Sequence, residues 1–309
     1  MTVTTRARRL AGRIYRRCAA PLGLRALGRM IDDGLPVRLA SPIQFLFTGE
    51  LSANARDARA RVERRRQAIA DRPETDPIAH TTTPHGLVHW PVERSAAPAG
   101  PRISGRWLAH VAAVPERWGL FLYLCADVAA AGTMLELGSS AGISAAYLAS
   151  GRGCRRLMTL EGSPILARLA QATLDEIAPG ASVIEGLFDN GLDHVFAALD
   201  QADAGLNLVY LDGHHDEVAT LHYVARLLPR LRPGALVILD DIYLYEEMWR
   251  AWNRIRTMPG ISVAVNLGRF GLFTCNEGHV RPEPFDLSRY TGRWRVGGSR
   301  RRTILGEGT

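Results

Sequence analysis

MLELGSSAGIS, residues 134–144, is the stretch that decides the fold of this chain. A short apolar strand runs into a tight loop between Gly138 and Gly142, and a helix is expected from Ala145 to Ser150. Glycine lets the backbone turn sharply and approach a ligand closely, and the first turn of a helix offers unpaired N–H groups to a polar or anionic group. The stretch therefore predicts a nucleotide-type cofactor site at the end of the first strand of an open α/β sheet.

The spacing of the two glycines argues against a dinucleotide cofactor. The loop has the form Gly-x-x-x-Gly, and Ser139 and Ser140 stand where the dinucleotide fingerprint expects glycine. It resembles instead the first motif of class I S-adenosylmethionine-dependent methyltransferases, whose cofactor carries no phosphate. That resemblance implies S-adenosylmethionine held by Gly138, Ser139, Ser140 and Gly142, with Glu136 facing the cationic methionine end. The alternative is a simple strand–helix turn.

An acidic residue follows the second predicted strand. Arg156 to Leu160 is a short apolar run that ends in Glu161, Gly162 and Ser163. An acid at this strand end is placed to accept both ribose hydroxyls of a nucleoside, and we expect Gly162 and Ser163 to lie beside the cofactor. In the alternative, Glu161 only stabilises the start of the next helix.

A third loop is expected to lie near the adenine. After the predicted strand Ala181–Glu185 come Phe188 and Asp189. In methyltransferases of this kind the loop at that point faces the adenine, so the resemblance implies that Asp189 accepts from the exocyclic amine. Phe188 would flank the ring or, in the alternative, pack in the core.

Acidic residues also end the next two predicted strands. The apolar run Leu206–Leu211 ends in Asp212, and the run Ala235–Leu239 ends in Asp240 and Asp241. Functional groups gather at the carboxyl ends of parallel strands. Three carboxylates therefore converge if these two strands are neighbours.

Converging carboxylates repel one another, and something must offset the repulsion. Each like-charge pair at about 4 Å costs roughly 4 kcal/mol at an effective dielectric of about 20. A divalent cation, a shared proton or arginine partners would offset this, and oxygen ligands suit Mg²⁺, Ca²⁺ or Mn²⁺ rather than zinc. We expect Asp212, Asp240 and Asp241 to hold a divalent cation, with Mg²⁺ favoured. In the alternative, one aspartate caps a helix and another faces solvent.

This layout, from about Trp118 to Cys275, resembles the metal-dependent catechol-type and sugar-type O-methyltransferases. In those enzymes a strand-end aspartate is followed by an acidic or Asp-Asn pair, which here comes 28 residues later. Asp212 is then expected to contact the cofactor as well as the metal. There are two departures: the catechol enzymes use a lysine base, and this chain has no lysine; their amide-bearing ligand is replaced by Asp241. The sugar-type enzymes carry a histidine three residues after the first aspartate, and His215 matches it.

A histidine at that position suits the chemistry. A hydroxyl acceptor must lose its proton as it attacks the sulfonium methyl group, and an imidazole with an ordinary pKa of about 6.5 is a suitable general base. His214 and His215 are adjacent, so we expect one of them to face the substrate and favour His215. In the alternative, both are polar loop residues.

Together these elements predict an α/β fold with a seven-stranded mixed sheet, the Rossmann-like methyltransferase fold, with helices on both faces and an N-terminal helical extension. Two apolar runs, Ile261–Leu267 and Arg269–Cys275, predict the final antiparallel hairpin. We divide the chain into residues 1–105 (basic arm, helical extension and linker), 106–278 (methyltransferase domain) and 279–309 (basic tail). Within the extension, Leu51–Ala70 is expected to form an exposed helix.

Composition limits the other function classes. Hydrophobic residues make up 47% of the chain, which is ample for a packed core. The four cysteines are scattered without a CxxC pair, which argues against a disulfide scaffold or a zinc site. No run of about 18 apolar residues exists, so no membrane span is expected. A secretory signal is not expected either, and the predicted location is cytoplasmic.

Positive charge gathers at the two ends of the chain. Residues 1–34 carry eight arginines and two aspartates, and residues 279–309 carry seven arginines and three acids. Such tails are commonly solvated arms. The alternative is attachment to nucleic acid or to an anionic membrane.

The functional expectation is an S-adenosylmethionine-dependent methyltransferase that uses a divalent metal to O-methylate a small hydroxylated acceptor: a natural product, a sugar or a phenol. One alternative is a metal-independent RNA or protein methyltransferase, which the arginine-rich arms favour. Another is a non-catalytic S-adenosylmethionine-binding protein, marked by aspartates engaged with arginines and by the lack of an open pocket. The sequence does not disclose the acceptor, and it leaves a homo-oligomer open.

Overall fold

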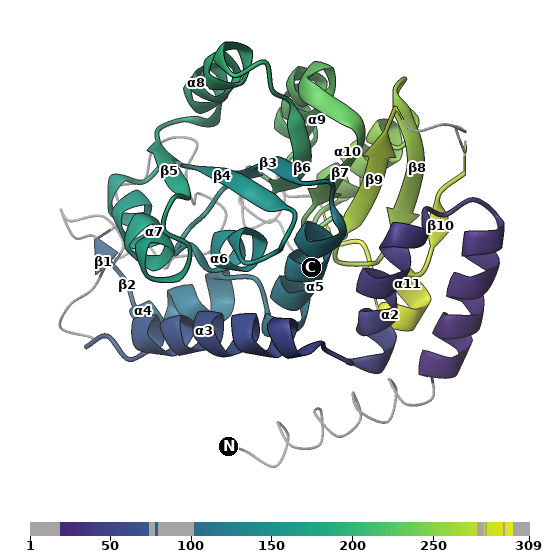
Figure 1. The fold of residues 1–309 in the computed structure, drawn as a ribbon, viewed down its shortest axis with the longest axis horizontal. Coiled ribbons are helices and arrows are strands. Elements are labelled where there is room, and N and C mark those ends of the chain that lie inside the picture. The colour runs from purple at the N-terminus through teal and green to yellow at the C-terminus, as the bar shows by residue number, and fades with distance from the viewer. Residues whose placement is uncertain are drawn as a thin grey trace.

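The computed structural model describes residues 19–73, 78–79, 102–276, 281, 283–292 and 294–298. At its centre is an eight-stranded sheet in the order β10-β8-β9-β7-β6-β3-β4-β5 (Figure 1). The strands are β3 Gly132–Leu137, β4 Cys154–Glu161, β5 Ser182–Glu185, β6 Leu206–Leu211, β7 Leu231–Leu239, β8 Ile261–Asn266, β9 Gly271–Cys275 and β10 Phe285–Asp286. Strands β3 to β7 pair in parallel, and β9 runs antiparallel between β7 and β8. A separate two-stranded sheet joins β1 Ile78–Ala79 to β2 Arg102–Ile103.

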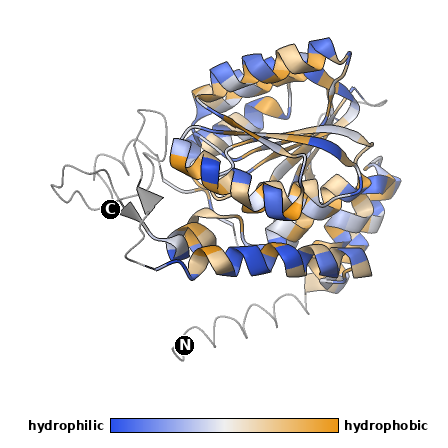
Figure 2. Ribbon diagram, turned by 60° about the vertical axis from the view of Figure 1, so that its left-hand side comes forward, coloured by the Kyte–Doolittle hydropathy of each residue, from blue (hydrophilic) through white to orange (hydrophobic). Residues whose placement is uncertain are grey.

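Helices cover both faces of the large sheet. On one face lie α5 Glu116–Val128, α6 Ile143–Ala149 and α7 Pro164–Ile177, and on the other lie α8 Phe188–Gln201, α9 Glu217–Leu227 and α10 Glu246–Ile255. Because successive strand residues point to opposite faces, Met134 packs into the first core and Leu135 and Leu137 into the second. The hydrophilic residues lie on the outer sides of the helices (Figure 2). The predicted α/β sheet with helices on both faces is confirmed.

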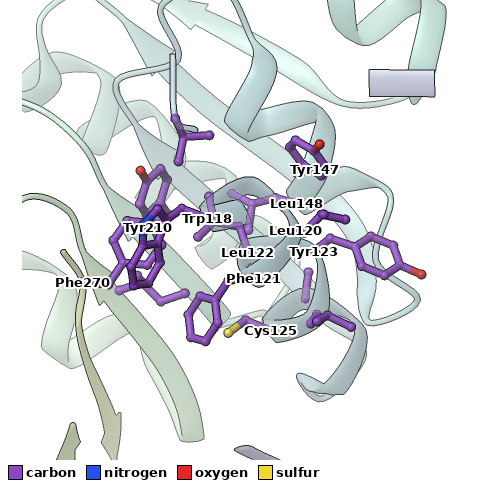
Figure 3. Packing of buried hydrophobic residues seen from close by; sticks show 14 of the residues in the cluster. Trp118, Leu120, Phe121, Leu122, Tyr123, Cys125, Tyr147, Leu148, Tyr210 and Phe270 are labelled. Atoms are coloured by element: carbon purple, nitrogen blue, oxygen red, sulfur yellow. The ribbon is translucent and has the colours of Figure 1, made fainter. Parts of the chain in front are cut away.

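An aromatic cluster anchors the middle of the first core. Trp118 of α5 packs on Phe270 with ring centroids 4.7 Å apart, and Tyr210 of β6 lies 5.7 Å from Phe270 (Figure 3). Phe121 and Phe270 are fully buried. This packing fixes Tyr210, whose hydroxyl reaches the carboxyl ends of the strands.

The sheet has one strand more than the seven predicted, because part of the presumed tail folds onto the domain. β10 pairs in parallel with β8, and Phe285 and Leu287 are buried. The short helix α11 Ser288–Thr291 follows, and Trp294 packs on Trp118 at 6.1 Å. These apolar side chains alternate with arginines, so the prediction of a solvated arm is wrong for Phe285, Leu287 and Trp294, while Arg289 and Arg295 are exposed. Strand β7 also begins at Leu231, four residues before the predicted start.

The N-terminal helices share the core of the sheet. Residues 19–32 are helical and are followed by η1 Val37–Leu39, α2 Ala40–Thr48 and α3 Ala53–Ala70. The prediction of an exposed helix is wrong for α3, because Val62 and Ile69 are buried against the domain. Arg66, also buried, donates to the carbonyl oxygens of Ala109 (2.7 Å) and Val114 (2.8 Å). Small residues spaced along an arginine-rich sequence therefore form a packing face.

Several predictions fall on residues that the structure does not describe. Residues 80–101, the main part of the predicted linker, and the arginine-rich ends 1–18 and 299–309 lie outside the described residues. In the described part of the chain, no helix combines the length and hydrophobicity needed to cross a bilayer. Contact of the basic ends with nucleic acid or an anionic membrane, a homo-oligomer, and the cytoplasmic location remain predictions.

Candidate active site

A cavity of about 360 Å³ opens at the carboxyl ends of β3, β4 and β6. The chain runs from β3 outward through β4 to β5, and then returns to build β6 and β7 on the other side of β3. Ligands of open α/β sheets bind at such a reversal of strand order. Backbone hydrogen bonds join the strand ends: Gly138 N–H donates to the Leu160 oxygen (2.9 Å), and Asp212 N–H to the Leu137 oxygen (2.9 Å).

Glu161 ends β4 and lines this cavity with its carboxylate held by two backbone donors. The N–H of Ser140 donates to Oε2 (2.8 Å), and the N–H of Ser163 donates to Oε1 (2.9 Å). Burial raises the pKa of Glu161 to about 7, and the donors from Ser163 and Ser140 limit the rise. Each oxygen keeps a lone pair, so the oriented carboxylate can accept two further hydroxyl groups.

The glycine-containing loop brings its backbone close to the neighbouring strand ends. Gly138 has φ +97°, and a Cβ there would lie 2.2 Å from the Asp212 oxygen, so only glycine fits without moving β6. Gly142 has φ +79°, is the N-cap of α6, and its N–H donates to the Ser139 oxygen (2.7 Å). Gly138 and Ser140 line the cavity. Ser139 and Gly142 do not line the cavity; the hydrogen bond between their backbones closes the loop.

Two other predicted cofactor residues are Gly162 and Ser163. Gly162 lines the cavity next to Glu161. Ser163 is the N-cap of α7: its side chain accepts from the N–H of Leu166, while its own N–H holds Glu161. Gly162 is therefore placed to touch a ligand, and Ser163 acts through the orientation of Glu161.

Glu136 is enclosed below the loop and does not line the cavity. Its side chain is 0% exposed, and the hydroxyl of Thr159 donates to its Oε2 (2.6 Å). Burial raises the pKa of Glu136 to about 8, and hydrogen bonds from Ser144 and Thr159 limit the rise. A neutral, enclosed carboxyl group does not fit the predicted contact with the cationic methionine end. Its hydrogen bond with Thr159 joins β3 to β4 instead.

Asp189 also lies away from the cavity. It sits in the first turn of α8, where His222 Nε2 is 2.8 Å and Arg226 Nη1 is 2.8 Å from its Oδ1. Hydrogen bonds to His222 and Arg226 keep the pKa of Asp189 below its usual value. This pairing with α9 does not fit the predicted adenine contact. Leu187 and Phe188, just before it, line the cavity instead.

His215 and Asp212 form a pair at the end of β6. His215 Nε2 lies 3.5 Å from Asp212 Oδ1, and both residues line the cavity. Burial lowers the pKa of His215, but the hydrogen bond to Asp212 and the charges of Asp241 and Asp240 outweigh burial, so the pKa is raised. An imidazole held against a carboxylate and facing a cavity can take a proton from a substrate.

His214 lies beside this pair but packs toward α9. Its ring stacks on Tyr223, with centroids 5.5 Å apart, and meets the edge of Phe188 at 5.2 Å. Both histidines have positive φ, 63° for His214 and 40° for His215. The backbone therefore turns sharply here, and His215 is the one placed against Asp212, as the sequence favours.

Arg269 contacts both aspartates that follow β7, Asp240 and Asp241. Asp240, fully buried at the end of β7, is contacted by Arg269 Nη2 at Oδ2 (2.9 Å) and by Arg269 Nε at Oδ1 (2.7 Å). The Tyr210 hydroxyl donates to Oδ2 (2.7 Å), and the N–H of Asp241 donates to Oδ1 (2.6 Å). Burial raises the pKa of Asp240 and the guanidinium of Arg269 opposes that rise. Asp240 does not line the cavity, whereas Asp241 and Arg269 do, with Arg269 Nη2 3.3 Å from Asp241 Oδ1.

Several known proteins have sequences similar to part of this chain. Residues 135–242 match the model of a methyltransferase domain. The chain is 32% identical over 132 residues to a catechol O-methyltransferase of Mycobacterium tuberculosis, which covers 42% of this chain and 57% of that protein. It is 28% identical over 130 residues to a catechol O-methyltransferase of Niastella koreensis, covering 42% and 58%. The chain thus spans less than two thirds of these curated relatives.

Residues 135–242 are thus similar to a methyltransferase domain. The predicted resemblance to class I S-adenosylmethionine-dependent methyltransferases is confirmed over this stretch. Among solved structures, the O-methyltransferase of Bacillus cereus in complex with SAH is similar to the chain with a TM-score of 0.44 and 21% identity. That match covers 53% of this chain and 82% of the other.

Within this stretch, the three predicted metal ligands do not form an open metal site. Asp240 accepts three hydrogen bonds, from the Tyr210 hydroxyl, Arg269 Nη2 and the N–H of Asp241, and Arg269 Nε lies 2.7 Å from its Oδ1. Among the described residues, no group of three His, Cys, Asp or Glu side chains is placed to hold a metal ion. Arg269 takes the position where the charge of a cation would be needed. The arrangement therefore does not fit the predicted magnesium site.

Arg269 is the main site residue that the sequence did not reveal. It was expected to begin a strand, but it lies in the turn between β8 and β9, and its backbone oxygen accepts from the N–H of Ile242 (3.1 Å). Arginine partners were one predicted way to offset the aspartates. The one signal in the sequence was its position next to Gly268, in a turn of the predicted hairpin. Because β9 pairs antiparallel with β7, this turn lies at the carboxyl end of β7.

Proposed function

We propose that this chain transfers the methyl group of S-adenosylmethionine to a hydroxyl oxygen of a small acceptor. The observation that carries the proposal is Glu161: a carboxylate in the cavity, oriented by two backbone N–H groups and with a lone pair left on each oxygen. That is an acceptor for the two hydroxyls of a ribose. The methyltransferase domain that contains it, and the catechol O-methyltransferases related to it, support the same reaction class.

The residues of the cavity fit this cofactor. Glu161 would hold the ribose hydroxyls, and the backbone of Gly138, Ser140 and Gly162 allows close approach of the nucleoside. Phe188 and Leu187 offer an apolar wall for the adenine. When bound, S-adenosylmethionine supplies an activated methyl group, so the protein is left to align the acceptor and remove its proton.

The proton of the acceptor would pass to His215. Its Nε2 is held 3.5 Å from Asp212 in the wall of the cavity, and Asp212 would stabilise the imidazolium that forms. His214, stacked on Tyr223, would shape the wall next to it. The acceptor oxygen then bonds to the methyl carbon as the carbon–sulfur bond breaks, and the proton leaves His215 for solvent.

The acceptor would carry an apolar body with at least one hydroxyl. Its part of the cavity is walled by side chains before α5 and after β7, among them Trp107, Val111, Leu244 and Tyr245. Apolar and aromatic walls with a few polar groups are usual for small-molecule sites. A phenol or an aromatic natural product fits better than a free sugar. Magnesium has no part in this proposal, because Asp240 is buried and paired with Arg269.

Titration calorimetry with S-adenosylhomocysteine tests the cofactor step. The wild-type chain is expected to bind one molecule, and Glu161→Ala to lose that binding. The matched control is Glu185→Gln, because Glu185 ends the neighbouring strand β5 in register with Glu161 but is exposed and does not line the cavity. Transfer of a labelled methyl group to a panel of phenols tests the reaction. Absence of binding by the wild-type chain would refute the proposal.

A further inference from the structure

Arg269 does for the acidic cluster what a divalent cation would do. Its guanidinium contacts Asp240 through Nε (2.7 Å) and Nη2 (2.9 Å) and lies 3.3 Å from Asp241. Tyr210 joins the remaining aspartate to the group, because its hydroxyl lies 2.7 Å from Asp240 and 3.2 Å from Asp212. The repulsion between the carboxylates is thus offset by a permanent positive charge from the chain itself.

A metal ion would have to displace these contacts. Mg²⁺ binds oxygen ligands at about 2.1 Å and demands near-octahedral geometry, yet Asp240 is 0% exposed, and each of its oxygens accepts a hydrogen bond and lies within 3 Å of the Arg269 guanidinium. Removing Arg269 from Asp240 would leave a buried carboxylate and place two like charges side by side. The cost of leaving such a charge unpaired is several kcal/mol.

The turn that carries Arg269 is built to hold it there. Leu267 N–H donates to the Phe270 oxygen (2.9 Å), and Gly268 N–H donates to Asn266 Oδ1 (2.9 Å). Trp294 fills the space against Gly268, where an added Cβ would lie 2.0 Å from its Nε1. The guanidinium is therefore positioned before any ligand binds, in the wall of the cavity.

We propose that methyl transfer by this chain needs no divalent cation, and that Arg269 replaces one in holding the acceptor oxygen. Within the described residues, its contacts with carboxylates use Nε and Nη2, which leaves Nη1 to donate to the acceptor. The acceptor O–H gives its proton to His215, its oxygen bonds to the methyl carbon, and the carbon–sulfur bond breaks. One hydroxyl then suffices, whereas chelation to a metal favours two adjacent oxygens. This inference rests on the proposed function.

Manganese binding tests the inference without a turnover assay. Mn²⁺ is titrated into the wild-type chain saturated with S-adenosylhomocysteine, and the electron paramagnetic resonance signal of free Mn²⁺ is followed. The signal is expected to rise as in buffer alone. One bound Mn²⁺ per chain that disappears in Asp240→Asn would overturn the inference. Failure of S-adenosylhomocysteine to bind would instead refute the proposed function, so the two failures are distinguishable.

Variants of Arg269 separate charge replacement from a merely structural role. Arg269→Gln, which removes the guanidinium from the aspartates, is expected to gain a Mn²⁺ site, and Arg269→Lys, which keeps a positive charge, is not. Arg250→Gln is the matched control, since Arg250 pairs with Glu217 (2.7 Å) and does not line the cavity. If a folded Arg269→Gln that binds S-adenosylhomocysteine gains no Mn²⁺ site, the guanidinium does not stand in for a cation.

Turnover gives a second, independent measurement on the wild-type chain. With EDTA present, methylation of a phenol with one hydroxyl is expected to stay within about twofold of the untreated rate. A rate that rises tenfold or more with Mg²⁺, or activity only on phenols with two adjacent hydroxyls, would overturn the inference.

Discussion

The affinity of this chain for S-adenosylhomocysteine should increase with pH because of Glu161. A ribose with two hydroxyl donors binds the ionised carboxylate, and burial raises the pKa of that group to about 7. Roughly a tenth of the molecules then carry the ionised form at pH 6 and roughly nine tenths at pH 8. The apparent Kd should therefore fall about tenfold between these two pH values and level off above pH 8.

Replacing the carboxylate should remove this dependence. In Glu161→Gln, the amide NH₂ would face the backbone N–H of Ser140 or Ser163, donor against donor, and the negative charge is lost. A hydrogen bond to a charged group contributes about 1.5–3 kcal/mol. The variant should thus bind roughly 10- to 150-fold more weakly than the wild type at pH 8, and equally at pH 6 and pH 8.

Calorimetry in two buffers with different ionisation enthalpies measures both the Kd and the number of protons released on binding. Binding fixes the ionised form, so at pH 7 about half a proton should be released per bound molecule. Glu185→Gln, on the neighbouring strand end, should behave as the wild type. If the wild type binds with the same Kd at pH 6 and pH 8, and Glu161→Gln binds equally well, the carboxylate does not hold the ribose.

Three further outcomes follow from the same contacts. His215→Ala should lower kcat by about 100-fold or more with unchanged S-adenosylhomocysteine affinity, as initial rates and calorimetry would show; an unchanged kcat would assign the base elsewhere. Glu136→Gln should stabilise the fold at high pH. The pKa of Glu136 is about 8 in the folded chain and 4.5 in the unfolded chain, so between pH 4.5 and pH 8 the folded chain keeps a proton that the unfolded chain releases. The stability of the wild type therefore declines as the pH rises through this range. Urea unfolding should show no gain for this variant at pH 4 and roughly 5 kcal/mol at pH 9, and a gain independent of pH would contradict this reasoning. Gly138→Ala should destabilise the chain by roughly 1–3 kcal/mol from backbone strain alone and abolish cofactor binding, because its Cβ would lie 2.2 Å from the Asp212 oxygen; binding at wild-type affinity would show that the loop adapts.

Strand ends were the most predictable part of this molecule. The predicted strand Leu206–Leu211 is found with the same bounds, and Glu161, Asp212 and Asp240 stand at the strand ends where the sequence places them. Apolar runs closed by an acidic residue carry this information locally. The exposed-helix prediction for α3 was wrong because its buried face is made of alanines, one valine and one isoleucine among many arginines.

Pairings between distant segments were not predictable. Glu161, found from its strand end alone, lines the cavity, but Asp189 is drawn to α9 by Arg226, 37 residues away. Arg269 reaches Asp240 across 29 residues because β9 pairs antiparallel with β7 and returns the chain to the carboxyl end of that strand. One sequence shows that the aspartates need a positive partner, but only the fold shows which one they have.

A crystal structure of this chain with S-adenosylhomocysteine tests the central claim most directly. We expect the ribose hydroxyls within about 3 Å of the two carboxylate oxygens of Glu161, and the nucleoside in the cavity beside Phe188, with the Asp212–His215 pair next to the sulfur. A nucleoside bound elsewhere, or a ribose that does not touch Glu161, would contradict the account.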